Sequence, residues 1–99
     1  MADATPELDR FLHAIGDPTR RRILRALKEK NSCSIDKQSG LCAADIELCV
    51  KLAQPTVSHH MRILEKAKVV VAKREGHWRW YRRNEPWIAE MMRGLKGQL

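Results

Sequence analysis

The chain has 99 residues, and its 19 Lys and Arg against 12 Asp and Glu give a net charge of +7. This length allows one small domain spanning residues 1–99, and 43% hydrophobic with 31% charged residues excludes a disordered or collagen-like chain. No apolar run approaches the roughly 20 residues of a membrane-spanning helix, and the polar start is unlike a secretory signal. The charge predicts a polyanionic partner, nucleic acid ahead of an acidic membrane surface.

The first part of the chain predicts two amphipathic helices. The apolar residues spaced i, i+3, i+4, i+7 along the first are Leu8, Phe11, Leu12 and Ile15. This helix ends near Gly16, and Asp17 followed by Pro18 is a typical N-cap and first-turn pair for a second helix reaching about Glu29. The second helix is rich in arginine, and we interpret these side chains as a solvated face: Arg20, Arg21, Arg22 and Arg25.

A polar loop at residues 30–40 separates these helices from two more. The third helix covers about residues 43–51 and places Ile46, Cys49 and Val50 on one side, so that Cys49 is expected to be a small core residue. After a short turn, Pro55 opens a fourth helix that ends at about Lys66. Its inward residues are expected to be Val57, Met61 and Leu64.

A β-hairpin and a last helix complete the chain. Residues 69–71 are three valines, and residues 78–82 alternate aromatic and basic side chains, which predicts two strands with Glu75 and Gly76 at the tip. Pro86 opens a fifth helix. The fold class is therefore mainly α, with four helices, a β-hairpin and a final helix.

The charge is concentrated in one segment. Residues 54–83 contain eight basic and two acidic residues, a net charge of +6, whereas residues 1–53 and 84–99 are nearly neutral. Such segregation is typical of a surface that binds a polyanion.

Residues 43–66 fit a helix-turn-helix whose second helix reads DNA, followed by a basic wing at residues 69–83. Small polar side chains stand at the start of that second helix, where they can reach base edges and where the helix dipole attracts phosphate. The candidate DNA-binding residues of the helix and wing are Gln54, Thr56, Ser58, His59, Arg62, Lys73, Arg74, His77 and Arg79.

Three segments in the same order closely resemble the ArsR/SmtB family of bacterial winged-helix repressors. They are Ala14–Arg20 leading to Ile23 and Leu24, Gln54–Met61, and Arg74–Gly76. The resemblance covers about residues 8–83 and implies a dimer of winged helix-turn-helix subunits that binds a palindromic double-stranded DNA operator and releases it when an inducer binds. It also implies that residues 54–62 form the recognition helix and residues 73–79 the wing.

Other interpretations compete at individual residues. We expect His60 to pack or cap inside the fold and His59, one position along, to face DNA. Strand aromatics usually cover the core of a small domain, so we favour that role over base stacking for Trp78, Trp80 and Tyr81. Lys68 occupies the position where the family usually has Gly before the first wing strand, which predicts a less tightly turned junction.

The terminal helices, within residues 1–16 and 86–99, carry apolar stripes that a small domain has little interior to cover. Ordinary packing within the chain is one explanation, and the resemblance favours a homodimer. The expected interface residues are Leu8, Phe11, Leu12, Ile15, Trp87, Ile88, Met91, Met92 and Leu95.

Three cysteines cannot all pair within one chain, so we expect reduced thiols in a bacterial cytoplasm, with the protein on the nucleoid when DNA-bound. The family's metalloid sensors carry Cys-x-Cys at the start of the third helix; here Cys42 is present and Ala44 replaces the second cysteine. Cys33 could restore a thiolate site with Cys42 for arsenite or zinc, or form a disulfide with it. The family's other metal site, on the last helix, is not expected because only Glu90 lies well inside that helix.

No cofactor is required, and an enzyme is not expected because no carboxylate is placed to orient a His base and there is no Gly-rich phosphate loop. The remaining alternative is a winged-helix module that binds another protein, or coats nucleic acid without sequence preference and without sensing an inducer. Polar rather than basic residues on the outer face of the recognition helix favour the sequence-specific regulator.

Overall fold

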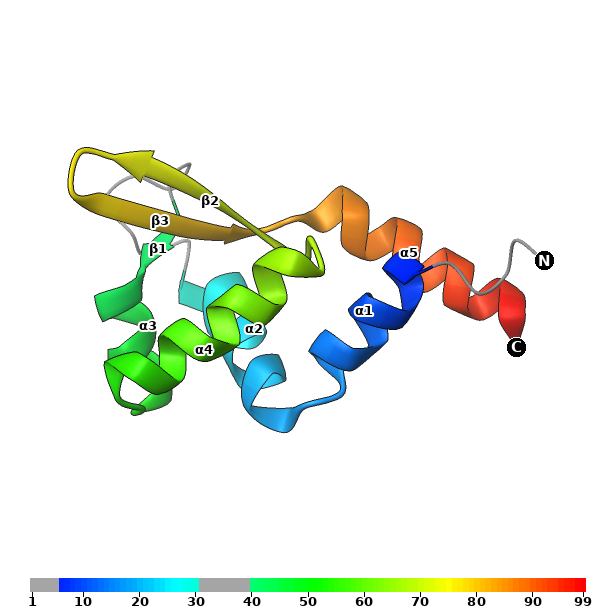
Figure 1. Ribbon diagram of the computed structural model, residues 1–99, viewed down its shortest axis with the longest axis horizontal. Helices are drawn as coiled ribbons and strands as arrows, with labels where there is room; N and C mark the ends of the chain where they lie inside the picture. The colour runs from blue at the N-terminus through cyan, green and yellow to red at the C-terminus, as the bar shows by residue number, and fades with distance from the viewer. Residues whose placement is uncertain (1–5, 31–39) are drawn as a thin grey trace.

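The computed structural model describes residues 6–30 and 40–99 and shows five helices and a small sheet in this part of the chain (Figure 1). The elements in chain order are α1 (Pro6–Ile15), α2 (Pro18–Lys30), β1 (Leu41–Cys42), α3 (Ala43–Val50), α4 (Gln54–Lys66), β2 (Val70–Glu75), β3 (Trp78–Arg83) and α5 (Glu85–Gln98). The predicted order of four helices, hairpin and helix is confirmed. The strand β1 is an addition, and most of the polar loop lies outside the described residues.

Local chemistry explains where the helices begin. The backbone N–H of Arg20 donates to the Asp17 carboxylate at 3.0 Å, which confirms Asp17 as the cap of α2. A proline stands in the first turn of α4 and of α5, where its missing N–H costs nothing. Between α4 and β2, Lys68 adopts a left-handed backbone with φ of 64°, so the junction keeps the tight turn that glycine normally provides.

The sheet is antiparallel with strand order β1-β3-β2. Glu75 pairs with Trp78, so the two-residue turn is Gly76–His77, one position later than expected, and Gly76 supplies the positive φ of 61°. Leu41 of β1 pairs with Tyr81 of β3. Tyr81 is buried as predicted, but Trp78 is 58% exposed, because alternation along β3 turns it to the outer face of the sheet.

The core lies between the helices and the inner face of the sheet. Its largest fully buried side chains include Phe11, Ile23, Leu27 and Ile46. The three predicted inward residues of α4, Val57, Met61 and Leu64, are at most 1% exposed. Cys49 is exposed, so its assignment to the core is wrong: Ile46 and Val50 alone, four residues apart, form the buried stripe of the short helix α3.

The solvated arginine face is wrong for Arg20 alone, since Arg21, Arg22 and Arg25 are exposed as expected. Arg20 is only 7% exposed. Arg21 donates to the carbonyl oxygen of Ile15 at 2.6 Å, and Arg22 donates to that of Val50 at 2.8 Å. These side chains tie α2 to the ends of α1 and α3, which satisfies carbonyl groups that a helix end leaves without a partner in its own ladder.

Helices α1 and α5 lie side by side at the end of the molecule opposite the hairpin tip (Figure 1). Leu8, Phe11 and Met91, three of the residues expected at a dimer interface, are buried in the core of the single chain. Helix α1 contacts both α4 and α5, so its inner stripe is already covered without a second copy.

Candidate nucleic-acid interface

The outer face of α4 carries the polar residues expected to meet DNA. Gln54, Thr56, His59 and Arg62 are exposed, and Ser58 is half-buried. The Gln54 side-chain amide donates to the Ser58 hydroxyl at 3.2 Å, one turn apart. Because the buried residues of α4 hold its opposite face against the core, this polar face is presented on a rigid helix.

The first turn of α4 is also electrostatically suited to phosphate. It contains no acidic residue, and its N-cap residue Ala53 makes no side-chain cap hydrogen bond. Aligned peptide dipoles give this end of a helix a partial positive charge and backbone N–H groups that an anion can bind.

The wing adds basic side chains beside this helix. Arg74 and Arg79 occupy directly opposed positions in β2 and β3, and Lys73 and His77 are exposed nearby. Lys73 forms an ion pair with Glu75 at 3.4 Å. Thus all four predicted wing residues lie at the surface of one hairpin.

Arg79 links the wing to α4. Its Nη2 donates to both carboxylate oxygens of Glu65, at 2.8 and 3.1 Å. The same guanidinium lies 5.9 Å from the centre of the Tyr81 ring. Arg79 is therefore engaged within the protein, whereas Arg74 makes no hydrogen bond or ion pair among the described residues.

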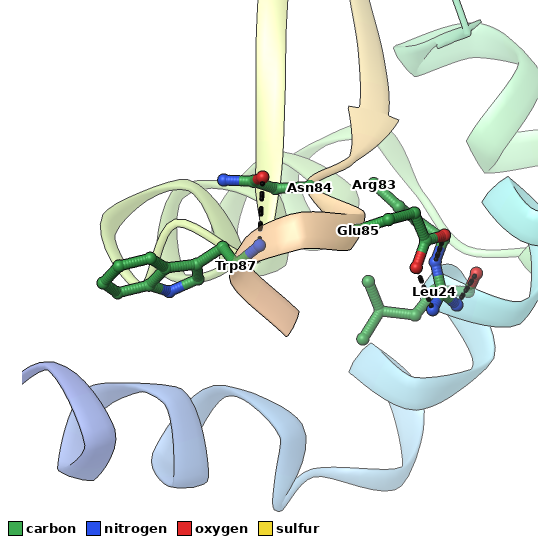
Figure 2. A network of polar contacts seen from close by, with 5 residues as sticks. All are labelled: Leu24, Arg83, Asn84, Glu85 and Trp87. Carbon is green, nitrogen blue, oxygen red and sulfur yellow. Dashed lines mark hydrogen bonds and ion pairs between the residues drawn. The ribbon is translucent and has the colours of Figure 1, made fainter. Parts of the chain in front are cut away.

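Part of the positive charge of residues 54–83 holds the base of the wing instead of facing outward (Figure 2). Arg83 donates to the Glu85 carboxylate at 2.7 Å and to the carbonyl of Leu24 at 3.3 Å. Next to it, Asn84 accepts from the backbone N–H of Trp87 at 3.4 Å and donates to the carbonyl of Lys68 at 3.0 Å. These contacts fix the hairpin to α2 and to the start of α5.

Sequence reasoning missed Arg20, which supports α4 from behind. Its guanidinium donates to the carbonyls of Ala14 at 2.7 Å and His13 at 3.1 Å, and its Nη1 lies 3.1 Å from Nδ1 of His60. His60 is half-buried, in keeping with a packing role, while the neighbouring His59 is exposed. The sequence signal for a structural role of Arg20 was its position three residues after the helix cap Asp17.

The cysteines do not assemble a thiolate site in the described part of the chain. The Cys42 thiol donates to the Asp45 carboxylate at 3.2 Å, and burial raises the pKa of Cys42. Its proposed partner Cys33 lies outside the described residues, and no group of three or more His, Cys, Asp or Glu able to hold a metal occurs among those described. The described residues alone therefore do not make up a metal or metalloid centre.

Comparison with known proteins decides the family. A family model described as a helix-turn-helix domain matches residues 15–71. The chain is 44% identical over 68 residues to an uncharacterized HTH-type transcriptional regulator of Methanocaldococcus jannaschii, covering 69% of this chain and 67% of that one. It is 32% identical over 89 residues to the arsenical resistance operon repressor of Staphylococcus aureus, covering 90% and 77%. The chain belongs to the ArsR/SmtB family.

A solved structure of an ArsR family transcriptional regulator shares the fold, with a TM-score of 0.72, 20% sequence identity and coverage of 93% of this chain and 86% of that one. As an ArsR/SmtB member, the protein is a DNA-binding transcriptional repressor and not an enzyme. The winged helix-turn-helix predicted from the sequence is confirmed. No helix in the described part of the chain is long and apolar enough to cross a membrane.

Proposed function

We propose that this ArsR/SmtB member is a homodimeric repressor that reads a palindromic double-stranded DNA operator with α4, grips the flanking phosphates with the wing, and acts in the cytoplasm. The observation that carries the proposal is the exposed polar face of α4 beside a basic hairpin. Side chains such as Gln54 and His59 donate and accept hydrogen bonds at base edges, while Arg62 and Arg74 pair with phosphate.

The polar character of α4 favours sequence-specific reading over non-specific coating of nucleic acid. A coating surface needs cations along its whole length, but the first six residues of α4 contain none. Each bidentate base contact is worth about 1–3 kcal/mol of discrimination between bases.

The test begins with selection of duplexes from a random-sequence library by the purified protein. We expect the selected duplex to bind at least about 1,000-fold more tightly than a random duplex at physiological salt. The double substitution T56A/H59A should reduce the ratio of specific to random affinity at least tenfold. The control K51A replaces an exposed residue outside the proposed DNA-reading face of α4 and should leave the ratio unchanged. Equal binding of selected and random duplexes would instead establish a non-specific module.

A homodimer is part of the same proposal, although fewer residues support it than the sequence suggests. Met92 is exposed, and five more of the expected interface residues are only partly buried: Leu12, Ile15, Trp87, Ile88 and Leu95. These residues of α1 and α5 supply the apolar surface that a second copy would cover.

Inducer release completes the proposed cycle, and the S. aureus relative, an arsenical resistance operon repressor, makes arsenite a chemical class to test. Reduced protein bound to the selected duplex is titrated with arsenite, zinc or a mild oxidant. Release that is abolished by C42A would assign the inducer to this thiol. No release with any of the three would exclude thiol sensing and leave a repressor without a thiol-directed inducer.

A further inference from the structure

A single buried guanidinium joins three elements behind the DNA-reading face. Arg20, in α2, donates through Nε and Nη2 to the carbonyls of Ala14 and His13 in the last turn of α1. Its third donor, Nη1, meets Nδ1 of His60 in the middle of α4, and its backbone N–H meets the Asp17 carboxylate. One polar contact between two side chains therefore joins α4 to the α1–α2 turn, in addition to the packing of the buried face of α4 against the core.

This contact requires a neutral histidine. A guanidinium has only donors, so Nδ1 of His60 must be the unprotonated acceptor and the imidazole proton must be on Nε2. A second proton removes the acceptor and places two cations in contact in a half-buried position. Arg20 then loses a partner that water cannot easily replace, because its side chain is almost fully enclosed.

Among the described residues, the titratable and charged groups that face His60 are Arg20 from α2, Asp17 from the turn before it and His59 from α4 itself. Burial, the largest influence, lowers the pKa of His60; the Asp17 carboxylate raises it, and Arg20 and His59 lower it further. The net direction is toward the neutral form that the Arg20 contact needs.

We propose that Arg20 is a positioning residue for DNA recognition, which holds α4 in its reading orientation through neutral His60, and that protonation of His60 releases α4 and weakens DNA binding in mild acid. This inference rests on the proposed role of α4 in binding DNA.

Positive charge gained by the DNA-binding surface in acid would strengthen binding to DNA, so the effect expected from His60 has the opposite sign. Neutral His60 belongs to the DNA-binding conformation, so its contribution to affinity is complete above about pH 6.5, the ordinary pKa of histidine, and is lost as the pH falls through the lowered pKa of His60. A loss of affinity in acid therefore reports the buried residue.

The experiment measures affinity for the selected duplex by fluorescence anisotropy at about pH 8 and pH 5.5, at one ionic strength. We expect the wild type to lose about fivefold or more in affinity on acidification. The H60N variant keeps an acceptor near Nδ1 and cannot be protonated, so its affinity should hold or rise in acid. The H59N variant removes the neighbouring histidine without touching Arg20, and it should retain the acid loss.

Two further measurements separate positioning from folding. Circular dichroism at both pH values must show the same helix content for every variant, and R20K, which lacks the planar fork, should bind weakly at both pH values. In the wild type, an NMR titration of the ring protons of His60 should show a lower pKa when the duplex is bound.

Acid loss equal in H60N and the wild type, or a His60 pKa unchanged by the duplex, would overturn this inference while leaving the proposed function intact. Failure of the wild type to prefer the selected duplex at pH 8 would instead overturn the proposed function.

Discussion

At the scale of single residues, Gly40 is the position where the fold has no room for a side chain. Its φ is +86°, and a methyl group there would lie 1.9 Å from the carbonyl oxygen of Tyr81 in β3. Because that obstacle is backbone, the chain at residue 40 or the facing strand β3 would have to move. We expect G40A to lower the free energy of unfolding by about 2 kcal/mol or more, measured by urea denaturation.

The matched control is G94A, the same substitution in the interior of α5. Nothing lies within 4 Å of a methyl group at that position, and alanine favours a helix over glycine. We expect G94A to raise the free energy of unfolding by about 0.5–1 kcal/mol. A G40A variant as stable as the wild type would show that the close approach of β1 to β3 does not require glycine at residue 40.

Individual residues also differ in how far their roles could be predicted from the sequence. Asp17 could be recognised as a helix cap because its partner is three residues away along the chain. The burial of Arg20 could not, since its acceptor His60 is 40 residues away and four arginines in one helix look like a solvated face. Cys49 was misplaced for a related reason: periodicity in an eight-residue helix does not decide between adjacent positions at the edge of a buried stripe.

At the scale of elements, helices with caps and long apolar periods were predictable, and β1 was not. A two-residue strand has too few residues to show alternation, and it exists because Leu41 and Cys42 pair with Tyr81 and Trp80, which are far along the chain. The hairpin was found, although its turn is shifted by one residue. The candidate DNA face of α4 followed from the inward positions, because a helix buried on one side must present the other.

The two opposed arginines of the wing are expected to differ in how strongly they contact DNA phosphate. Arg79 is held by Glu65, whereas the opposed Arg74 has no such partner among the described residues. We expect R74A to reduce the slope of log Kd against log salt by about 0.9 for each subunit, and R79A to reduce it by less. Both slopes are measured with the selected duplex.

The companion variant E65Q removes the carboxylate that engages Arg79. In the E65Q background, R79A should reduce the slope of log Kd against log salt by as much as R74A does, because the Arg79 guanidinium is then available to DNA. If R74A and R79A changed the slope equally in the wild-type background, DNA would displace Glu65 from Arg79. The Arg79–Glu65 ion pair would then not keep Arg79 from contacting phosphate.

At the scale of the whole molecule, most of the net charge of +7 belongs to α4 and the hairpin, which form the proposed DNA-binding surface. Helices α1 and α5 form a second surface, with the proposed role of dimerisation. The hairpin tip lies at one end of the molecule and α1 and α5 lie at the other, and α4 extends from the hairpin end toward α1 (Figure 1). Arg83 and Arg79 form ion pairs with Glu85 and Glu65, so fewer basic side chains are available to pair with DNA phosphates. Dimerisation through α1 and α5 would place two such basic surfaces in one particle and steepen the salt dependence.

That assembly depends on apolar residues that the single chain leaves uncovered, and among the expected interface residues Met92 in α5 is the most exposed, at 47%. Leu8, Phe11 and Met91 belong to the core, so substituting them would unfold the chain and say nothing about assembly. We expect the wild type to sediment at about twice its 11.4 kDa chain mass at micromolar concentration, and M92E to shift toward the monomer because a dimer would bury its charge.

The control V71E introduces the same charge at another exposed apolar residue, on the sheet and away from α5. It should leave the sedimenting mass unchanged, and both variants should keep the helix content of the wild type. M92E would support a link between dimerisation and DNA binding if it were monomeric, lost affinity for the palindromic duplex and still bound a half-site. In that case α1 and α5 set the spacing at which two α4 helices enter successive major grooves. A wild type that sedimented as a monomer, or an M92E that stayed dimeric, would remove α5 from the interface.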